Sequence, residues 1–177
     1  TPNRIVVAVD PPVTGHSGSD ECGIIVAGVL TEGPLQLWRG IILEDASIAG
    51  ASPQKWAEAA VDAFHRHRAD RVIAEVNQGG DLVEQMLRQI DPSLPYRAVR
   101  ASRGKAARAE PVAALYEQRR IVHRGSLPKL EGQMVQMCQQ GFAGPGSPDR
   151  VDALVWAITE LMLEPASQFR AARVRSL

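Results

Sequence analysis

Short apolar runs, each ended by a breaking residue, dominate the hydrophobic pattern and predict buried β-strands. The first run extends without interruption from Ile5 to Val9 and is followed by Asp10 and then by Pro11-Pro12. A run this short that stops at prolines favours a buried strand over a helix, since proline cannot extend a central ladder. Asp10 therefore lies where the strand ends. It either accepts backbone N–H groups in the turn or binds a metal, because an unpaired carboxylate there is costly.

Two further apolar runs predict a hairpin beside the first strand. They extend from Cys22 to Leu30 and from Leu35 to Leu43, and turn-forming residues join them at positions 31–34. The link that follows the first strand is too short for a helical crossover. The first three strands are therefore expected to form an antiparallel meander.

The remaining chain alternates between helical and extended patterns. The first helix begins at Ser52-Pro53, with serine as the cap and proline at the first helical position, and the last helix has Ser147 as its expected cap. The expected elements are a helix from Pro53 to about Asp70, a strand Arg71–Val76, a helix from Asp81, a strand Tyr96–Val99, a helix Lys105–Gln118 interrupted by Pro111, an extended piece Ile121–His123, a helix Leu127–Gln140 and a helix from about Asp149 to Leu163.

This order predicts an α/β fold with one central mixed sheet of five strands or slightly more and helices on both faces. The first three strands are antiparallel, and the helix after them allows the fourth strand to lie parallel to the first. We expect one domain over residues 1–165 and a basic tail over residues 166–177 that is frayed or ordered only by a partner.

Composition narrows the class of protein without identifying it. The 177 residues are 45% hydrophobic and 23% charged, with a formal net charge of zero, so no overall basic field indicates nucleic acid. Positive charge nevertheless gathers between Arg97 and Arg124 and in the tail. Cys22 and Cys138 lack metal-site spacing, which suggests reduced thiols in a cytoplasmic setting. No membrane-length apolar run or signal peptide is visible, and the start without Met suggests a fragment of a longer protein.

Four acidic residues lie at the expected ends of two strands and at the expected start of the last helix, which should be close together in the fold. Asp10 ends the first strand and Glu75 the fourth, and sites in such sheets gather beyond the carboxyl ends of parallel strands. Asp149 and Asp152 share one face in the first turn of the last helix. Two of them have a plainer alternative: Glu75 as an outward-facing surface residue, and Asp149 as an acid favoured by the helix dipole. Together the four would repel one another unless a cation lay between them.

These motifs resemble the ribonuclease-H-like nucleases, which include the RuvC-type resolvases. They are most similar to the C-terminal nuclease domain of the large terminase subunit of tailed phages or gene-transfer agents. The resemblance covers nearly the whole chain, through the stretches AVDPPVTGHSGSDECGIIVAGV, VIAEVNQGGD, GKAARAEPVAALYEQRRIVH, LPKLEGQMVQM and SPDRVDALVWAI.

The resemblance implies a set of functional residues. Asp10 and Glu75 match metal-binding acids, Asp149 and Asp152 match the acids of the last helix, and Asp20 matches a further acid before the second strand. The family often has His-Asp-Asp at positions 147–149, where this chain has Ser-Pro-Asp. That departure leaves open which of Asp149 and Asp152 binds metal directly, and Asp20 could equally serve the loop.

The chemistry of phosphodiester hydrolysis agrees with this set. Two hard cations about 3.5–4 Å apart can activate water and stabilise the leaving oxygen. Carboxylates without Cys or His suit Mg²⁺ or Mn²⁺. We expect Asp10 to bridge two ions, with Glu75 on one and Asp149 and Asp152 on the other.

Three cations lie where the resemblance places a GKxxR motif. Arg103, Lys105 and Arg108 could neutralise DNA phosphates, or they could be ordinary surface charge at a helix start.

The resemblance implies an Mg²⁺- or Mn²⁺-dependent endonuclease that cuts concatemeric double-stranded DNA when viral genome packaging begins and ends, in the cytoplasm of a bacterial host. The implied partners are double-stranded DNA, an N-terminal ATPase domain, a portal and a small terminase subunit, with no membrane. The ATPase domain lies outside this chain, which has no GxxxxGK[ST] motif. The alternatives are a RuvC-like Holliday-junction resolvase and a non-catalytic ribonuclease-H-like module that binds DNA or proteins.

Overall fold

A seven-stranded mixed sheet forms the centre of the computed structural model, which describes residues 1–12, 21–76, 81–138 and 141–165. The strand order is β6-β5-β1-β2-β3-β7, and the short β4 pairs with the start of β2. The strands are β1 (Arg4–Asp10), β2 (Glu21–Leu30), β3 (Arg39–Asp45), β4 (Ile48–Ala49), β5 (Arg71–Glu75), β6 (Tyr96–Val99) and β7 (Ile121–His123).

Strand directions confirm the predicted meander and the predicted parallel pair. β2 runs antiparallel to both of its neighbours, β1 and β3, whereas β5 lies beside β1 and parallel to it. β6 is parallel to β5, and β7 is parallel to β3. The carboxyl ends of β1 and β5 therefore lie at the same edge of the sheet.

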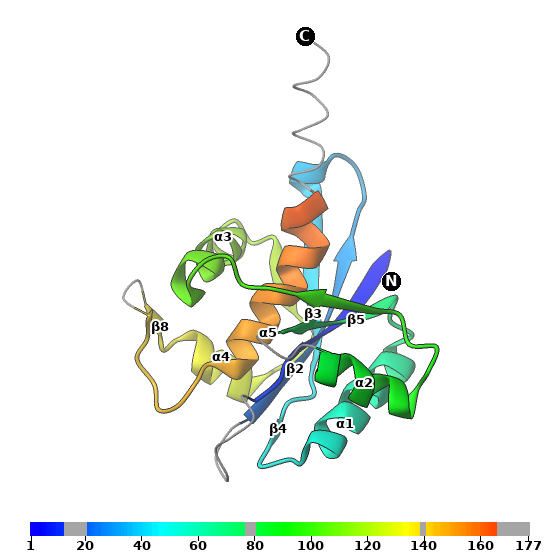
Figure 1. The fold of residues 1–177 in the computed structure, drawn as a ribbon. Coiled ribbons are helices and arrows are strands. Elements are labelled where there is room, and N and C mark those ends of the chain that lie inside the picture. Colours follow the sequence, from blue (N-terminus) through cyan, green and yellow to red (C-terminus); the bar gives the residue numbers. More distant parts are fainter. Residues whose placement is uncertain (13–20, 77–80, 139–140, 166–177) are drawn as a thin grey trace.

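Helices cover both faces of the sheet (Figure 1). Alternation along β1 separates two cores: Val6 and Ala8 pack on the side of α5, and Val7 and Val9 on the side of α1. Helices α3, α4 and α5 contribute to the first core and α1 and α2 to the second. The helices are α1 (Pro53–His67), α2 (Asp81–Ile90), α3 (Lys105–Glu117), α4 (Pro128–Met134) and α5 (Asp149–Ile158), which continues into a π-helical turn, η2 (Thr159–Leu163).

The first helix forms for the reasons that its sequence predicts. The Ser52 hydroxyl accepts a hydrogen bond from the Lys55 amide at 3.4 Å, and Pro53 occupies the first helical position. Trp56, Ala60 and Val61 are buried against the sheet. None of the helices in the described part of the chain has the length and apolarity that a membrane crossing requires.

Two predicted elements were too long. Leu35–Leu37 forms a 3₁₀ turn, η1, and strand β3 begins only at Arg39. The helix predicted over 127–140 ends at Met134, and β8 (Met137–Cys138) then pairs with β9 (Gly141–Phe142). Val135 is 82% exposed, so continuing the helix would bury no side chain there.

Two predicted helix details were also wrong. Helix α3 continues through Pro111, although proline removes one backbone hydrogen bond, that to the carbonyl of the exposed residue Ala107. Pro148, not Ser147, is the N-cap of α5, and it provides no side-chain cap.

Candidate metal centre

Three carboxylates meet where β1 ends and α5 begins. Asp10 is the last residue of β1, and Asp149 and Asp152 lie in the first turn of α5. One carboxylate oxygen from each residue lies within 4.8 Å of the others, and this is the only such group among the described residues. We call Asp10, Asp149 and Asp152 the acidic cluster.

A glycine on the neighbouring strand allows this close approach. Gly23 of β2 pairs with Asp10 across the antiparallel ladder. A Cβ atom at Gly23 would lie 2.0 Å from the Asp149 carbonyl oxygen and 2.5 Å from its carbonyl carbon. The start of α5 can therefore pack against the end of β1 only because position 23 has no side chain.

The acidic cluster is electrostatically unfavourable without a cation. Burial raises the pKa of Asp10 well above its usual value, and the Asp152 and Asp149 carboxylates raise it further. Burial also raises the pKa of Asp149 and of Asp152. Crowded, partly buried oxygen ligands of this kind suit a hard divalent cation such as Mg²⁺ or Mn²⁺. The donor set therefore fits the predicted metal.

Lys105, at the start of α3, partly neutralises the acidic cluster. Its ammonium group donates hydrogen bonds to the Asp152 carboxylate and, at 3.0 Å, to the Ser147 hydroxyl. Burial lowers the pKa of Lys105, but the hydrogen bond to Asp152 and the surrounding carboxylates outweigh this and raise the pKa overall. The Lys105 side chain is 47% exposed, so it is paired with Asp152 and still accessible to solvent.

Glu75 lies at the end of β5, one strand away from Asp10, and is not part of the 4.8 Å group. Its Oε2 atom accepts hydrogen bonds from the Trp156 indole at 2.7 Å and from Arg108 at 3.1 Å. The Arg108 guanidinium lies 4.7 Å from the centre of the Trp156 ring. Glu75 is near enough to contribute to the raised pKa of Asp10, so it faces the same end of the sheet.

The structure thus separates the predicted site residues into groups. Asp10, Asp149 and Asp152 are brought together, and Glu75 is beside them but bonded to Arg108. Lys105 and Arg108 are paired with acids, whereas Arg103 is exposed in the turn before α3. Asp20 lies outside the described residues.

Sequence reasoning missed the close approach of α5 to Gly23 and the hydrogen bond from Trp156 to Glu75. A signal for Trp156 was available, because it follows Asp152 by four residues and Asp149 by seven, which places all three on one helix face.

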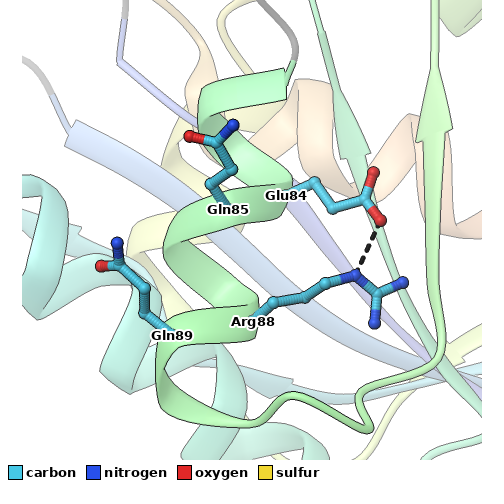
Figure 2. Close-up of a pocket in the computed structure, with 4 residues that line it drawn as sticks. All are labelled: Glu84, Gln85, Arg88 and Gln89. Carbon is cyan, nitrogen blue, oxygen red and sulfur yellow. Dashed lines mark hydrogen bonds and ion pairs between the residues drawn. The ribbon is translucent and has the colours of Figure 1, made fainter.

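Two surface hollows lie apart from the acidic cluster. Figure 2 shows one on α2 of about 550 Å³, lined by Glu84, Gln85, Arg88 and Gln89, in which Arg88 donates to Glu84 at 2.7 Å. Another, of about 730 Å³, lies beside η1 and the turn after α3. Neither includes a residue of the acidic cluster, so neither changes the assignment of the site.

The sheet order and the acids at the carboxyl ends of β1 and β5 define a ribonuclease-H-like domain. Residues 7–161 match the family described as the terminase RNaseH-like domain. The chain therefore belongs to that family, which confirms the resemblance inferred from its motifs. No curated protein matches the chain by sequence.

Solved structures agree with the family assignment. The large terminase nuclease of thermophilic phage G20c is 14% identical and superposes with a TM-score of 0.65, covering 89% of this chain and 82% of that one. A second structure of that nuclease, with bound magnesium, gives 0.64 at the same identity and coverage. The large terminase nuclease domain of bacteriophage SPP1 with bound Mn is 14% identical and gives 0.57, covering 89% and 86%. At this identity the likeness establishes the fold.

Raising the pH is expected to destabilise the metal-free protein through the acidic cluster. The folded protein keeps on Asp10 a proton that the unfolded chain releases near pH 4, so this stabilisation is complete at low pH and is lost as the pH rises towards the raised pKa. We predict that Asp10→Asn melts increasingly above wild type as the pH rises from about 4 to about 8 in chelator. A constant difference across that range would contradict the prediction.

Proposed function

We propose that this domain is the metal-dependent endonuclease of a viral DNA-packaging terminase, cutting concatemeric double-stranded DNA when packaging begins and ends. The observation that carries the proposal is the meeting of Asp10, Asp149 and Asp152 within 4.8 Å at the edge of a terminase RNaseH-like fold. The bound magnesium and Mn in solved terminase nucleases support the same chemistry here.

In this proposal Asp10, Asp149 and Asp152 would hold Mg²⁺ or Mn²⁺. Bound ions of this kind activate a water and stabilise the leaving oxygen of a phosphodiester. Glu75 completes the set from β5, and its bonds to Arg108 and Trp156 fix its orientation before any cation binds.

Three basic side chains would contact the DNA phosphates in this proposal. Arg103 is exposed and available at once. Lys105 is paired with Asp152, and Arg108 is paired with Glu75. Both basic side chains would become available to DNA phosphates once a metal ion neutralises those carboxylates. The Arg108 Nε atom is buried with no hydrogen-bond partner in the described part of the chain, so the present pairing of Arg108 is incomplete.

The proposal extends to the assembly that the family implies. The domain would work in the cytoplasm of the host cell, joined to an N-terminal ATPase domain and acting with a portal and a small terminase subunit. Those partners would hold the DNA and time the cut.

Millimolar Mn²⁺ is expected to raise the melting temperature, because a ligand that binds only the folded state stabilises it by mass action. At one hundred times the dissociation constant the gain is about 2.7 kcal/mol, or roughly 5–10 °C for a domain of this size. Thermal melts of wild type and Asp10→Asn with and without Mn²⁺ test this. An unchanged wild-type melting temperature would count against a shared metal site.

The isolated domain is expected to cut DNA weakly and with little sequence preference. The net charge is zero and the acids repel the backbone, so affinity depends on a few cations, each contributing about −0.9 to the slope of log affinity against log salt. Cleavage of several unrelated duplexes over a salt series measures this. Arg103→Ala should flatten the salt dependence, whereas Arg39→Ala, an exposed arginine on β3, should not.

The same series should include a four-way junction. A strong preference for the junction would favour the resolvase alternative, and tight, site-specific cutting of one duplex would contradict the expected dependence on partners.

A further inference from the structure

Arg150 lies between two residues of the acidic cluster in sequence, yet its side chain points away from them into a buried ion-pair network. The residue is 3% exposed, which is unusual for an arginine. Such a group is retained in a core only when its charge and its donors are paired.

Two carboxylates from different strands hold the Arg150 guanidinium. Glu21, the first residue of β2, accepts from Nε at 2.9 Å and from Nη2 at 2.6 Å. Asp45, the last residue of β3, accepts two bonds from Nη1, at 2.6 and 2.5 Å. The planar guanidinium therefore ties the first turn of α5 to the ends of both strands.

A second link holds the backbone of the same residue. The Arg150 amide donates to Gln133 Oε1 at 3.1 Å, and Gln133 Nε2 in turn donates to Glu21 at 3.3 Å. The network thus includes α4 as well, and it fixes the backbone and the side chain of Arg150, the residue that directly follows Asp149.

We propose that Arg150 is a positioning residue, which fixes the rotation and depth of the first turn of α5 so that Asp149 and Asp152 face Asp10. The inference rests on the proposed metal-binding role of the acidic cluster. Gly23 sets how closely α5 approaches the sheet, and Arg150 sets its register there. Arg150 touches neither metal nor substrate and acts through the acids on either side of it.

Arg150→Lys tests the inference with least risk to folding. Lysine keeps the charge but is a point donor that cannot satisfy both carboxylates in the same fork geometry. Residues that orient metal ligands typically contribute 10- to 100-fold in metal affinity, and Arg150 would orient Asp149 and Asp152 through the helix backbone, so we expect at least about a tenfold weaker Mn²⁺ binding, measured as loss of the free Mn²⁺ paramagnetic resonance signal.

Arg97→Lys is the matched control. Arg97 also pairs with two carboxylates, Glu160 and Glu164, but it does so beside η2, at the far end of the helix that begins with Asp149. We expect Arg97→Lys to lower the melting temperature without changing Mn²⁺ affinity.

Hydrogen–deuterium exchange without metal gives a second readout that does not depend on Mn²⁺ binding. In wild type the amides of Arg150 and Asp152 are bonded to Gln133 Oε1 and to the Pro148 carbonyl, so they should be protected. Arg150→Lys should speed exchange across residues 148–153, and Arg97→Lys should leave that segment unchanged.

The outcomes separate the two ideas. A wild-type protein that binds no Mn²⁺ would overturn the proposed function, while exchange would still report on positioning. Unchanged exchange and unchanged Mn²⁺ affinity in Arg150→Lys would overturn the positioning role. So would equal losses of Mn²⁺ affinity in Arg150→Lys and Arg97→Lys, since these would reflect general destabilisation.

Discussion

Replacing Asp10 with asparagine is expected to reduce Mn²⁺-dependent DNA cleavage by on the order of a thousandfold or more. Asp10 is the member of the acidic cluster placed by the central strand, and it is a proposed metal ligand. Metal ions contribute several kcal/mol of transition-state stabilisation, and each 1.4 kcal/mol or so changes the rate about tenfold. The measurement is the initial rate of plasmid nicking and linearisation at saturating Mn²⁺.

The fold of this variant should be intact. Burial and two neighbouring carboxylates raise the pKa of Asp10, so a neutral amide relieves repulsion in the metal-free protein. The melting temperature without metal should equal or exceed that of wild type. Asp62→Asn, at an exposed position on α1, is the matched control and should cleave normally. Undiminished cleavage by Asp10→Asn would refute the site assignment.

Gly23→Ala is expected to lower cleavage about a hundredfold and to destabilise the protein by about 1–3 kcal/mol. The added Cβ would lie 2.0 Å from the Asp149 carbonyl oxygen, which is backbone and cannot rotate away, so α5 must move. Overpacking of this kind typically has that cost in stability, and a displacement of about 1 Å at a reacting centre can reduce a rate a hundredfold. Rates and melting temperatures of the variant measure both effects.

Gly28→Ala provides the comparison on the same strand. Its Cβ would meet the side chain of Pro2 at 2.7 Å, at the opposite end of β2 from the acidic cluster. We expect some loss of stability and no loss of cleavage once the proteins are compared well below their melting temperatures. Equal cleavage by Gly23→Ala and wild type would show that the approach of α5 is not critical.

The fold was largely predictable because the core strands are marked in the sequence by short apolar runs that end at breaking residues. The unbroken run Ile5–Val9 and the run after Cys22 became β1 and β2, and the helix after Ser52 began at the predicted cap. The errors lay where tertiary context decides. Leu35–Leu37 carries a strand-like pattern, yet it forms a 3₁₀ turn in which Leu37 is 63% exposed and covers no sheet face.

The proximity of three of the four predicted acids could be inferred from the sequence, but their contacts with other side chains could not. Strand ends and helical spacing brought Asp10, Asp149 and Asp152 together as expected. Nothing local in the sequence shows that Lys105 reaches Asp152 or that Arg108 reaches Glu75, since those contacts join positions 47 and 33 residues apart. The role of Gly23 is visible only when α5 is placed on the sheet.

The most direct test of the central claim is the location of Mn²⁺ by anomalous X-ray scattering from crystals of the wild-type domain soaked in Mn²⁺. The account predicts at least one anomalous peak bonded to carboxylate oxygens of Asp10 and of Asp149 or Asp152, and no such peak in Asp10→Asn. A wild-type protein that cleaves DNA in Mn²⁺ but shows no peak at the acidic cluster, or binds Mn²⁺ only elsewhere, would contradict it.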